Sequence, residues 1–130
     1  MDRIANFIIK LKNGNAAGRK VAEFPYSRMI EAVANVLKSE GFLADVSVKV
    51  KKKSKKLEMS FDYEKDGKVP KISGVKRISH LSQRTYIKAK DMRKVRNGFG
   101  KLIVSTPEGV MTGDAAKKAG VGGEALFEVW

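Results

Sequence analysis

The chain has 130 residues, one histidine and no cysteine, which excludes disulfides and thiolate metal sites and argues against a zinc site built by the protein. No apolar run approaches the ~20 residues that span a bilayer, and Met1 leads directly into an amphipathic helix, so we expect a cytoplasmic protein without membrane contact. The net charge of +13 favours a polyanionic partner.

Two amphipathic helices are predicted in the first third of the chain. Asp2 can cap a helix whose apolar residues recur at helical spacing, with Asn13-Gly14 as its stop signal. After a short strand over residues 21–24, Ser27 can cap a second helix that runs to Glu40. The apolar stripe expected to face the core in this second helix consists of Ile30, Val33, Ala34 and Leu37.

Two strands with alternating apolar residues follow, over residues 46–50 and 57–63, and each is expected to bury one face. Residues 51–56 between them hold five lysines, which repel one another. This exposed hairpin end can lie near phosphates, or it can be a solvated edge that resists aggregation, and the sequence leaves both open. Asp66-Gly67 closes this first unit, and residues 68–70 are the expected linker.

The second half predicts short strands around residues 72–78 and 84–88, a helical turn over residues 91–96, a turn at Asn97-Gly98 and a strand over residues 101–104. Most of the excess charge lies here. Eleven Lys or Arg and one acidic residue give the segment from residue 68 to residue 101 a net charge of +10. Such side chains supply phosphate contacts, which give affinity without sequence information.

The stretch from residue 105 to residue 124 carries the most specific pattern. The hydroxyls of Ser105 and Thr106 are expected to be exposed at a loop edge, before the turn signals of Pro107 to Gly109 and a two-residue strand. Thr112 can cap a short helix, which ends at the next glycine. The pair Gly122-Gly123 allows unusual φ values and removes side chains, so that another backbone can approach before the last strand.

Catalytic residue sets are nearly absent from the sequence. His80 has no cysteine to pair with, and no serine lies in a nucleophile-elbow context. The glycine-rich residues 120–123 lack the lysine and hydroxyl of a phosphate-binding P-loop and precede a strand. We therefore do not expect an enzyme, a cofactor or a metal.

Three motifs resemble the S8 family of bacterial small-subunit ribosomal proteins: residues 74–79, residues 84–88 and the stretch from residue 105 to residue 124. The similarity extends over nearly the whole chain. It departs from the family's usual residues at Pro107, at Leu81-Ser82 and at Gly113. The resemblance implies an α+β fold, in which an N-terminal α-β-α-β-β domain (residues 1–67) packs on a mostly antiparallel β C-terminal domain with a short helix (residues 68–130).

The resemblance also implies a function. Members of this family are structural constituents of the small ribosomal subunit, bind a stem of the central domain of small-subunit ribosomal RNA and help its assembly. The implied partners are this RNA, neighbouring small-subunit ribosomal proteins and, in some members, the protein's own messenger RNA; we expect a monomer when free. The alternative that charge alone allows is a non-specific basic DNA-binding protein.

The candidate RNA-binding residues combine the family motifs with the basic segments. Tyr86 alternates with Thr85 and Ile87, so it can cover an unstacked base or be buried in the core, and the sequence leaves both open. Glu124 is expected to accept hydrogen bonds from loop hydroxyls or backbone amides and to orient the loop. The full set is Ser105, Thr106, Glu124, Arg84, Tyr86, Lys76, Arg77, Gly122, Gly123 and Lys55.

Overall fold

A computed structural model describes residues 3–64, 69–80 and 82–130, and the chain forms two compact units. Unit 1 ends at Ser73 and unit 2 begins at Gly74. The described residues form three α-helices and two larger antiparallel sheets, which confirms the expected α+β class. The cap expected at Asp2, the boundary expected between residues 67 and 68, and Leu81 lie outside the described residues.

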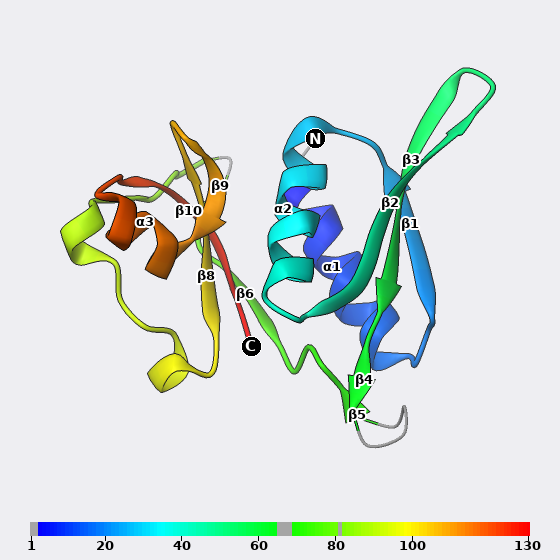
Figure 1. Ribbon diagram of the computed structural model, residues 1–130, viewed down its shortest axis with the longest axis horizontal. Helices are drawn as coiled ribbons and strands as arrows, with labels where there is room; N and C mark the ends of the chain where they lie inside the picture. The colour runs from blue at the N-terminus through cyan, green and yellow to red at the C-terminus, as the bar shows by residue number, and fades with distance from the viewer. Residues whose placement is uncertain (1–2, 65–68, 81) are drawn as a thin grey trace. The chain divides into compact units, whose positions relative to one another are not determined.

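In unit 1, two helices lie on one face of a three-stranded sheet with the strand order β1-β3-β2 (Figure 1). The two short strands that follow pair with each other. The elements are α1 (Arg3–Ala16), β1 (Val21–Pro25), α2 (Arg28–Ser39), β2 (Leu43–Lys51), β3 (Ser54–Phe61), β4 (Tyr63–Glu64) and β5 (Val69–Pro70).

Helix α2 confirms its prediction. The hydroxyl of Ser27 accepts a hydrogen bond from the Ile30 amide at 3.1 Å and so satisfies one of the free donors of the first turn. All four residues of the predicted stripe are fully buried. Burial of a side chain such as Ile30 or Leu37 stabilises the fold by about 1.5–3 kcal/mol, so tertiary packing contributes more to this helix than its cap does.

Helix α1 is longer than predicted, because Asn13-Gly14 does not stop it. Gly14 lies inside the helix, where a Cβ atom would come within 2.9 Å of the Phe61 ring. The side chain of Asn15 is buried and donates a hydrogen bond to the Ile72 carbonyl at 2.9 Å. Gly14 and Asn15 therefore serve packing. The positive φ that closes the end of the helix is found at Gly18 and not at Gly14.

Strand β3 buries Leu57 and Met59 as predicted, but the prediction that β2 buries its valines was wrong. Val48 lies opposite Leu57, yet β2 is an edge strand and leaves it partly exposed. Val50 lies opposite Lys55 of β3, whereas the pairing of β3 with β1 ends one residue earlier along the sheet, at Lys56. Val50 is 65% exposed. The end of the β2–β3 hairpin, which carries the lysine run, thus projects as an exposed arm (Figure 1).

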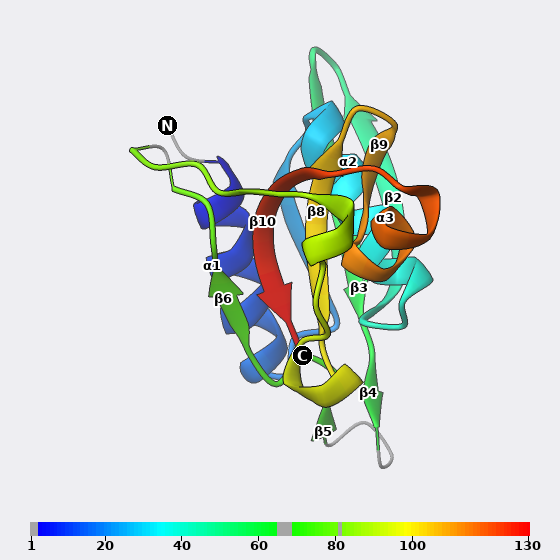
Figure 2. The ribbon, with the colours of Figure 1, turned by 90° about the vertical axis from the view of Figure 1, so that its left-hand side faces the viewer.

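Unit 2 is organised around its last strand, β10, which is flanked by β6 and β8 in the order β6-β10-β8-β9 (Figure 2). The two-residue strand β7 also pairs with β10, at its N-terminal end. The elements of unit 2 are β6 (Val75–Arg77), β7 (Tyr86–Ile87), the 3₁₀ turns η1 (Ala89–Asp91) and η2 (Arg96–Gly98), β8 (Lys101–Thr106), β9 (Gly109–Thr112), α3 (Gly113–Ala119) and β10 (Gly123–Val129).

The helical turn predicted over residues 91–96 is replaced by the two 3₁₀ turns, which lie on either side of an extended segment. Met92 and Val95 face the core as predicted, but they do so from extended backbone. They pack in a buried cluster with Leu102, Val104 and Ala116. This cluster connects the segment after β7 to β8 and α3.

Helix α3 begins and ends where the sequence predicted. The Thr112 hydroxyl accepts a hydrogen bond from the Ala115 amide at 3.2 Å, and Gly120 takes the left-handed conformation, with φ 71°. Asp114 lies in the first turn, where the helix dipole favours negative charge, and its carboxylate pairs with Lys101 at 3.2 Å.

Candidate nucleic-acid interface

Two glycines allow the strands of unit 2 to converge closely. A Cβ atom on Gly122 would lie 2.7 Å from the Ile87 carbonyl oxygen, and one on Gly123 would overlap the Ser105 carbonyl oxygen. Neither glycine is among the residues with positive φ. The predicted close approach of backbones is therefore confirmed, whereas the positive φ that glycine allows is not used at this pair.

A hollow of about 580 Å³ lies on the surface at this convergence. Its walls come from β7, from the end of β8 and from the start of β10, three segments far apart in the sequence. Six of the ten candidate residues line it: Tyr86, Ser105, Thr106, Gly122, Gly123 and Glu124.

Tyr86 stands out from the surface at this hollow. It is 71% exposed, whereas its neighbours Thr85 and Ile87 are half-buried. The short strand β7 therefore turns its other face to the core, with Ile87 packed against the buried cluster. Of the two alternatives that the sequence left open, the structure selects the exposed ring, which is available for stacking.

Thr106 does not fit the expected exposed hydroxyl. The residue is only 9% exposed and lies in β8, opposite Gly109 of β9. Its hydroxyl donates to the Gly109 carbonyl at 2.7 Å and accepts from the Glu108 amide at 3.1 Å. The prediction of exposure was wrong for this residue, because the hydroxyl closes the two-residue hairpin turn made by Pro107 and Glu108.

Ser105 is half-buried and also lies in the strand, not in a loop. It pairs with Glu124 on one side and Val110 on the other. Within the described part of the chain, its hydroxyl has no hydrogen-bond partner. Ser105 lines the hollow, and its hydroxyl can donate to, or accept from, a ligand.

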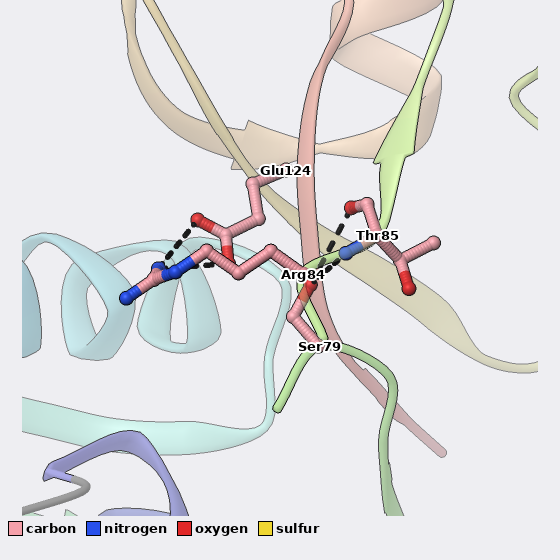
Figure 3. A network of polar contacts seen from close by, with 4 residues as sticks. All are labelled: Ser79, Arg84, Thr85 and Glu124. Atoms are coloured by element: carbon pink, nitrogen blue, oxygen red, sulfur yellow. Dashed lines mark hydrogen bonds and ion pairs between the residues drawn. The ribbon is translucent and has the colours of Figure 1, made fainter. Parts of the chain in front are cut away.

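Glu124 is held by an arginine instead of by hydroxyls or amides. Both carboxylate oxygens accept from one terminal nitrogen of Arg84, at 3.1 and 3.2 Å (Figure 3). The turn that carries Arg84 is itself fixed: the buried Ser79 hydroxyl accepts from the Thr85 amide at 2.9 Å, and the Thr85 carbonyl accepts from the Ala125 amide. Arg84 thus offsets the only carboxylate among the described residues that line the hollow.

The remaining candidates lie elsewhere. Lys76 and Arg77 are in β6, which pairs with the opposite end of β10 from the hollow. Lys55 belongs to unit 1, where its ammonium lies 5.1 Å from the centre of the Tyr26 ring. Tyr26 in turn donates a hydrogen bond to Glu31 at 3.0 Å, and this bond is the main cause that raises the pKa of Tyr26.

The candidate set omitted three residues that line the hollow: Ile87, Lys88 and Pro107. Lys88 follows Tyr86 by two residues, so the strand period that places Tyr86 outward also predicts an exposed lysine beside it. The lining therefore offers an aromatic ring, a free hydroxyl, a cation and a carboxylate paired with arginine. This set suits binding, because the described residues of the lining include no second carboxylate and no histidine for proton transfer.

Neither a metal centre nor a membrane span is found in the described part of the chain. Residues 3–64, 69–80 and 82–130 contain no cluster of three or more His, Cys, Asp or Glu side chains that could hold a metal ion. The helices among these residues are too short or too polar to cross a bilayer.

Comparisons with known proteins agree on one family. The family described as "Ribosomal protein S8" matches residues 2–130. The protein named "Small ribosomal subunit protein uS8" of Mycoplasmopsis synoviae (strain 53) is 38% identical over 99% of this chain and 97% of its own. The proteins of the same name from Limosilactobacillus reuteri (strain DSM 20016) and Streptococcus mutans are 40% and 39% identical, with the same coverage. The chain therefore belongs to the ribosomal protein S8 family.

Proposed function

We propose that this protein is a structural constituent of the small ribosomal subunit that binds a stem of the central domain of small-subunit ribosomal RNA, and that it helps this domain assemble. One observation carries the proposal: seven candidates named from the sequence either line a single hollow or, in the case of Arg84, pair with a residue that does. Residues far apart in the chain converge there on an arrangement suited to RNA.

Recognition uses the stacking face and the free hydroxyl together. An irregular A-form stem presents a shallow minor groove with 2′-hydroxyls, and it exposes unstacked bases that an aromatic ring can cover. Tyr86 supplies the ring, and Ser105 supplies a hydroxyl that can both donate and accept. Gly122 and Gly123 allow the backbones of β7, β8 and β10 to approach closely enough to form the hollow. Lys88 contributes a phosphate contact at the same site.

The Arg84–Glu124 pair acts as an orienting device. A free carboxylate would repel phosphates, but this one lies between 3.1 and 3.2 Å from a guanidinium nitrogen. The pair therefore presents a fixed donor–acceptor edge with little net charge, which favours selectivity over general affinity.

A non-specific DNA-binding protein is the rival, since the charge of +13 alone allows it. The two functions differ in the role of the hollow: it contributes to binding of the ribosomal stem, but a protein that binds DNA through its charge alone does not need it. Binding to the ribosomal stem and to duplex DNA of equal length should be compared at physiological salt, with the unmodified protein and with Tyr86→Ala. Loss of a stacked base costs about 1–3 kcal/mol, so we expect about 5- to 150-fold weaker binding to the stem and nearly unchanged binding to DNA.

Equal affinity of the unmodified protein for both ligands would refute the proposal. Tyr86→Phe is the matched control, because it keeps the ring and removes only the hydroxyl. The remaining contacts with phosphates should make the logarithm of the stem affinity fall with the logarithm of salt concentration, by about 0.7–0.9 for each phosphate neutralised.

The proposed location is the ribosome, with neighbouring small-subunit proteins as further partners and a monomer as the free state. Binding to the protein's own messenger RNA uses the same hollow if that RNA contains a similar stem. Competition between the two RNAs for one site tests this, and simultaneous binding would contradict it.

A further inference from the structure

Phe99 is the most exposed large apolar side chain described, with 85% of its surface open to solvent. It follows the 3₁₀ turn η2 in unit 2 and does not line the hollow at Tyr86. A single exposed phenylalanine is not informative by itself, since folded proteins leave much apolar surface in water. Two further features of the same loop bear on its role: its backbone conformation and a cationic hollow beside it.

The first feature is a rigid and strained backbone. Three consecutive residues have positive φ: 47° at Arg96, 56° at Asn97 and 96° at Gly98. The loop is closed at its base by the Val95–Gly100 bridge, and the Val95 carbonyl accepts from the Gly98 and Gly100 amides at 3.0 and 3.1 Å. Backbone held in this region is costly for residues other than glycine and is concentrated at functional sites.

The guanidinium of Arg96 also fixes the loop, since it lies 3.8 Å from the centre of the Trp130 ring. Trp130 is anchored in turn, because its backbone amide donates to the Gly74 carbonyl at 3.0 Å. Phe99 is thus presented on a preformed backbone, so little backbone entropy remains to be lost when its ring is covered.

The second feature is a cationic hollow of about 200 Å³ beside the loop. Gly98 and Gly100, which flank Phe99 in the sequence, line it together with Arg93, Lys94 and Lys101. Its only acidic residue, Asp114, is paired with Lys101 at 3.2 Å and leaves the other two cations in excess. Such a hollow suits a phosphate group.

A third hollow, of about 520 Å³, links the two sites. It is lined by Tyr86 and Lys88, which also line the hollow at Tyr86, and by Arg93 and Lys94, which also line the cationic hollow. Two carboxylates, Asp91 and Glu128, line it as well. A continuous surface therefore runs along unit 2 from Tyr86 to the loop of Phe99, and its linking part carries one cation in excess of its two carboxylates. This continuity, together with four bases and no acid between residues 93 and 101, favours a nucleic-acid strand as the occupant.

We infer that the loop from Val95 to Gly100 is a second RNA contact, in which an unpaired base stacks on Phe99 while its phosphate lies in the hollow lined by Arg93, Lys94 and Lys101. The ligand is single-stranded RNA that continues from the bound stem. The inference relies on the proposed function for the nature of its partner, but it uses different residues from those that read the stem.

The test adds a single strand of about eight adenosines, within the range of single-strand binding sites, to the full protein already saturated with its stem. Phe99→Ala should weaken binding of the oligonucleotide by about 5- to 150-fold and leave the affinity for the stem unchanged. Phe99→Trp should retain binding. Phe99→Leu keeps apolar bulk without a flat ring and should behave like Phe99→Ala. Val50→Ala, at another exposed apolar side chain, should change nothing.

Unchanged oligonucleotide binding in Phe99→Ala, or none by the unmodified protein, would overturn the inference while leaving the stem result intact. Failure of the unmodified protein to prefer the stem would instead refute the proposed function. A photoreactive benzoylphenylalanine at position 99 in assembled small subunits should form an adduct with ribosomal RNA. An adduct with a protein, or no adduct, would show that RNA does not cover this loop.

Discussion

The neighbouring hydroxyls of Ser105 and Thr106 should have separable roles, and two single substitutions test this. Thr106→Val removes a hydroxyl that makes two internal hydrogen bonds, to the Gly109 carbonyl and from the Glu108 amide. Each such bond contributes about 0.5–1.5 kcal/mol, so the expected loss of folding free energy is about 1–3 kcal/mol. Valine keeps the shape of the side chain, and the loss therefore measures the bonds.

Ser105→Ala should show the opposite pattern. Its hydroxyl has no partner within the described residues, so folding free energy should change by less than about 0.5 kcal/mol. If the hydroxyl bonds to the stem, its removal leaves a group on the RNA unpaired and costs about 1–3 kcal/mol of binding. Binding to an unrelated stem should hardly change, because the phosphate contacts remain.

Urea unfolding measures the first effect, and fluorescence anisotropy with labelled stems measures the second. Hydrogen exchange provides a local control, since the amide of Glu108 should exchange faster in Thr106→Val only. A Thr106→Val protein that is as stable as the unmodified protein, or a Ser105→Ala protein that binds both stems equally weakly, would refute this division of roles.

Substitutions at three other contacts have separate expected outcomes. Gly123→Ala places a methyl group against the backbone of β8 and should cost about 1–3 kcal/mol of stability by urea unfolding; an unchanged midpoint would mean that β8 and β10 can separate freely. Glu124→Gln frees Arg84, so binding to unrelated RNA should strengthen and the ratio of specific to unrelated affinity should fall; a constant ratio would contradict the orienting role. In unit 1, the Lys38 ammonium donates a hydrogen bond to the Asp45 carboxylate at 3.0 Å, and this bond is the main cause that lowers the pKa of Asp45 below its ordinary 3.8. The pair therefore stabilises the fold above that pH and loses its effect as the pH falls through the lowered pKa, so Asp45→Asn should be less stable than the unmodified protein at neutral pH but not in strong acid.

The sequence predicted those elements whose signals are local. Helix α2 has its cap at Ser27 and its stripe at helical spacing, and α3 has Thr112 and Gly120 at its ends; all of these interactions form within a few residues. The close approach at Gly122 and Gly123 was also predictable, because a pair of glycines before a strand leaves room for another backbone.

The errors arose where distant residues decide the outcome. Alternation predicted that Val50 lies on a regular face, but it could not show that the end of the hairpin extends beyond its neighbouring strand. Asn13-Gly14 is a stop signal that packing overrides, since the Phe61 ring occupies the space beside Gly14. The partner of the Thr106 hydroxyl depends on the hairpin register that places Thr106 opposite Gly109.

For the candidate site, the sequence supplied the residue types, and the fold determined which of them meet. Tyr86 lies outward because Ile87 fills the core position of a two-residue strand. The partner of Glu124 proved to be Arg84, forty residues earlier in the chain, a separation at which spacing gives no information. Lys76 and Arg77 share the basic segment with Arg84 but pair near the other end of β10.

The most direct test of the proposed recognition is a titration of ¹⁵N-labelled protein with the ribosomal stem, followed by amide chemical shifts. The account predicts that the largest shifts fall at the hollow, at Ile87, Ser105, Gly122 and Gly123, and that an unrelated stem of equal charge leaves these amides nearly unchanged. Large shifts confined to the lysine run of the β2–β3 hairpin, or the same shifts with both stems, would contradict recognition by the hollow.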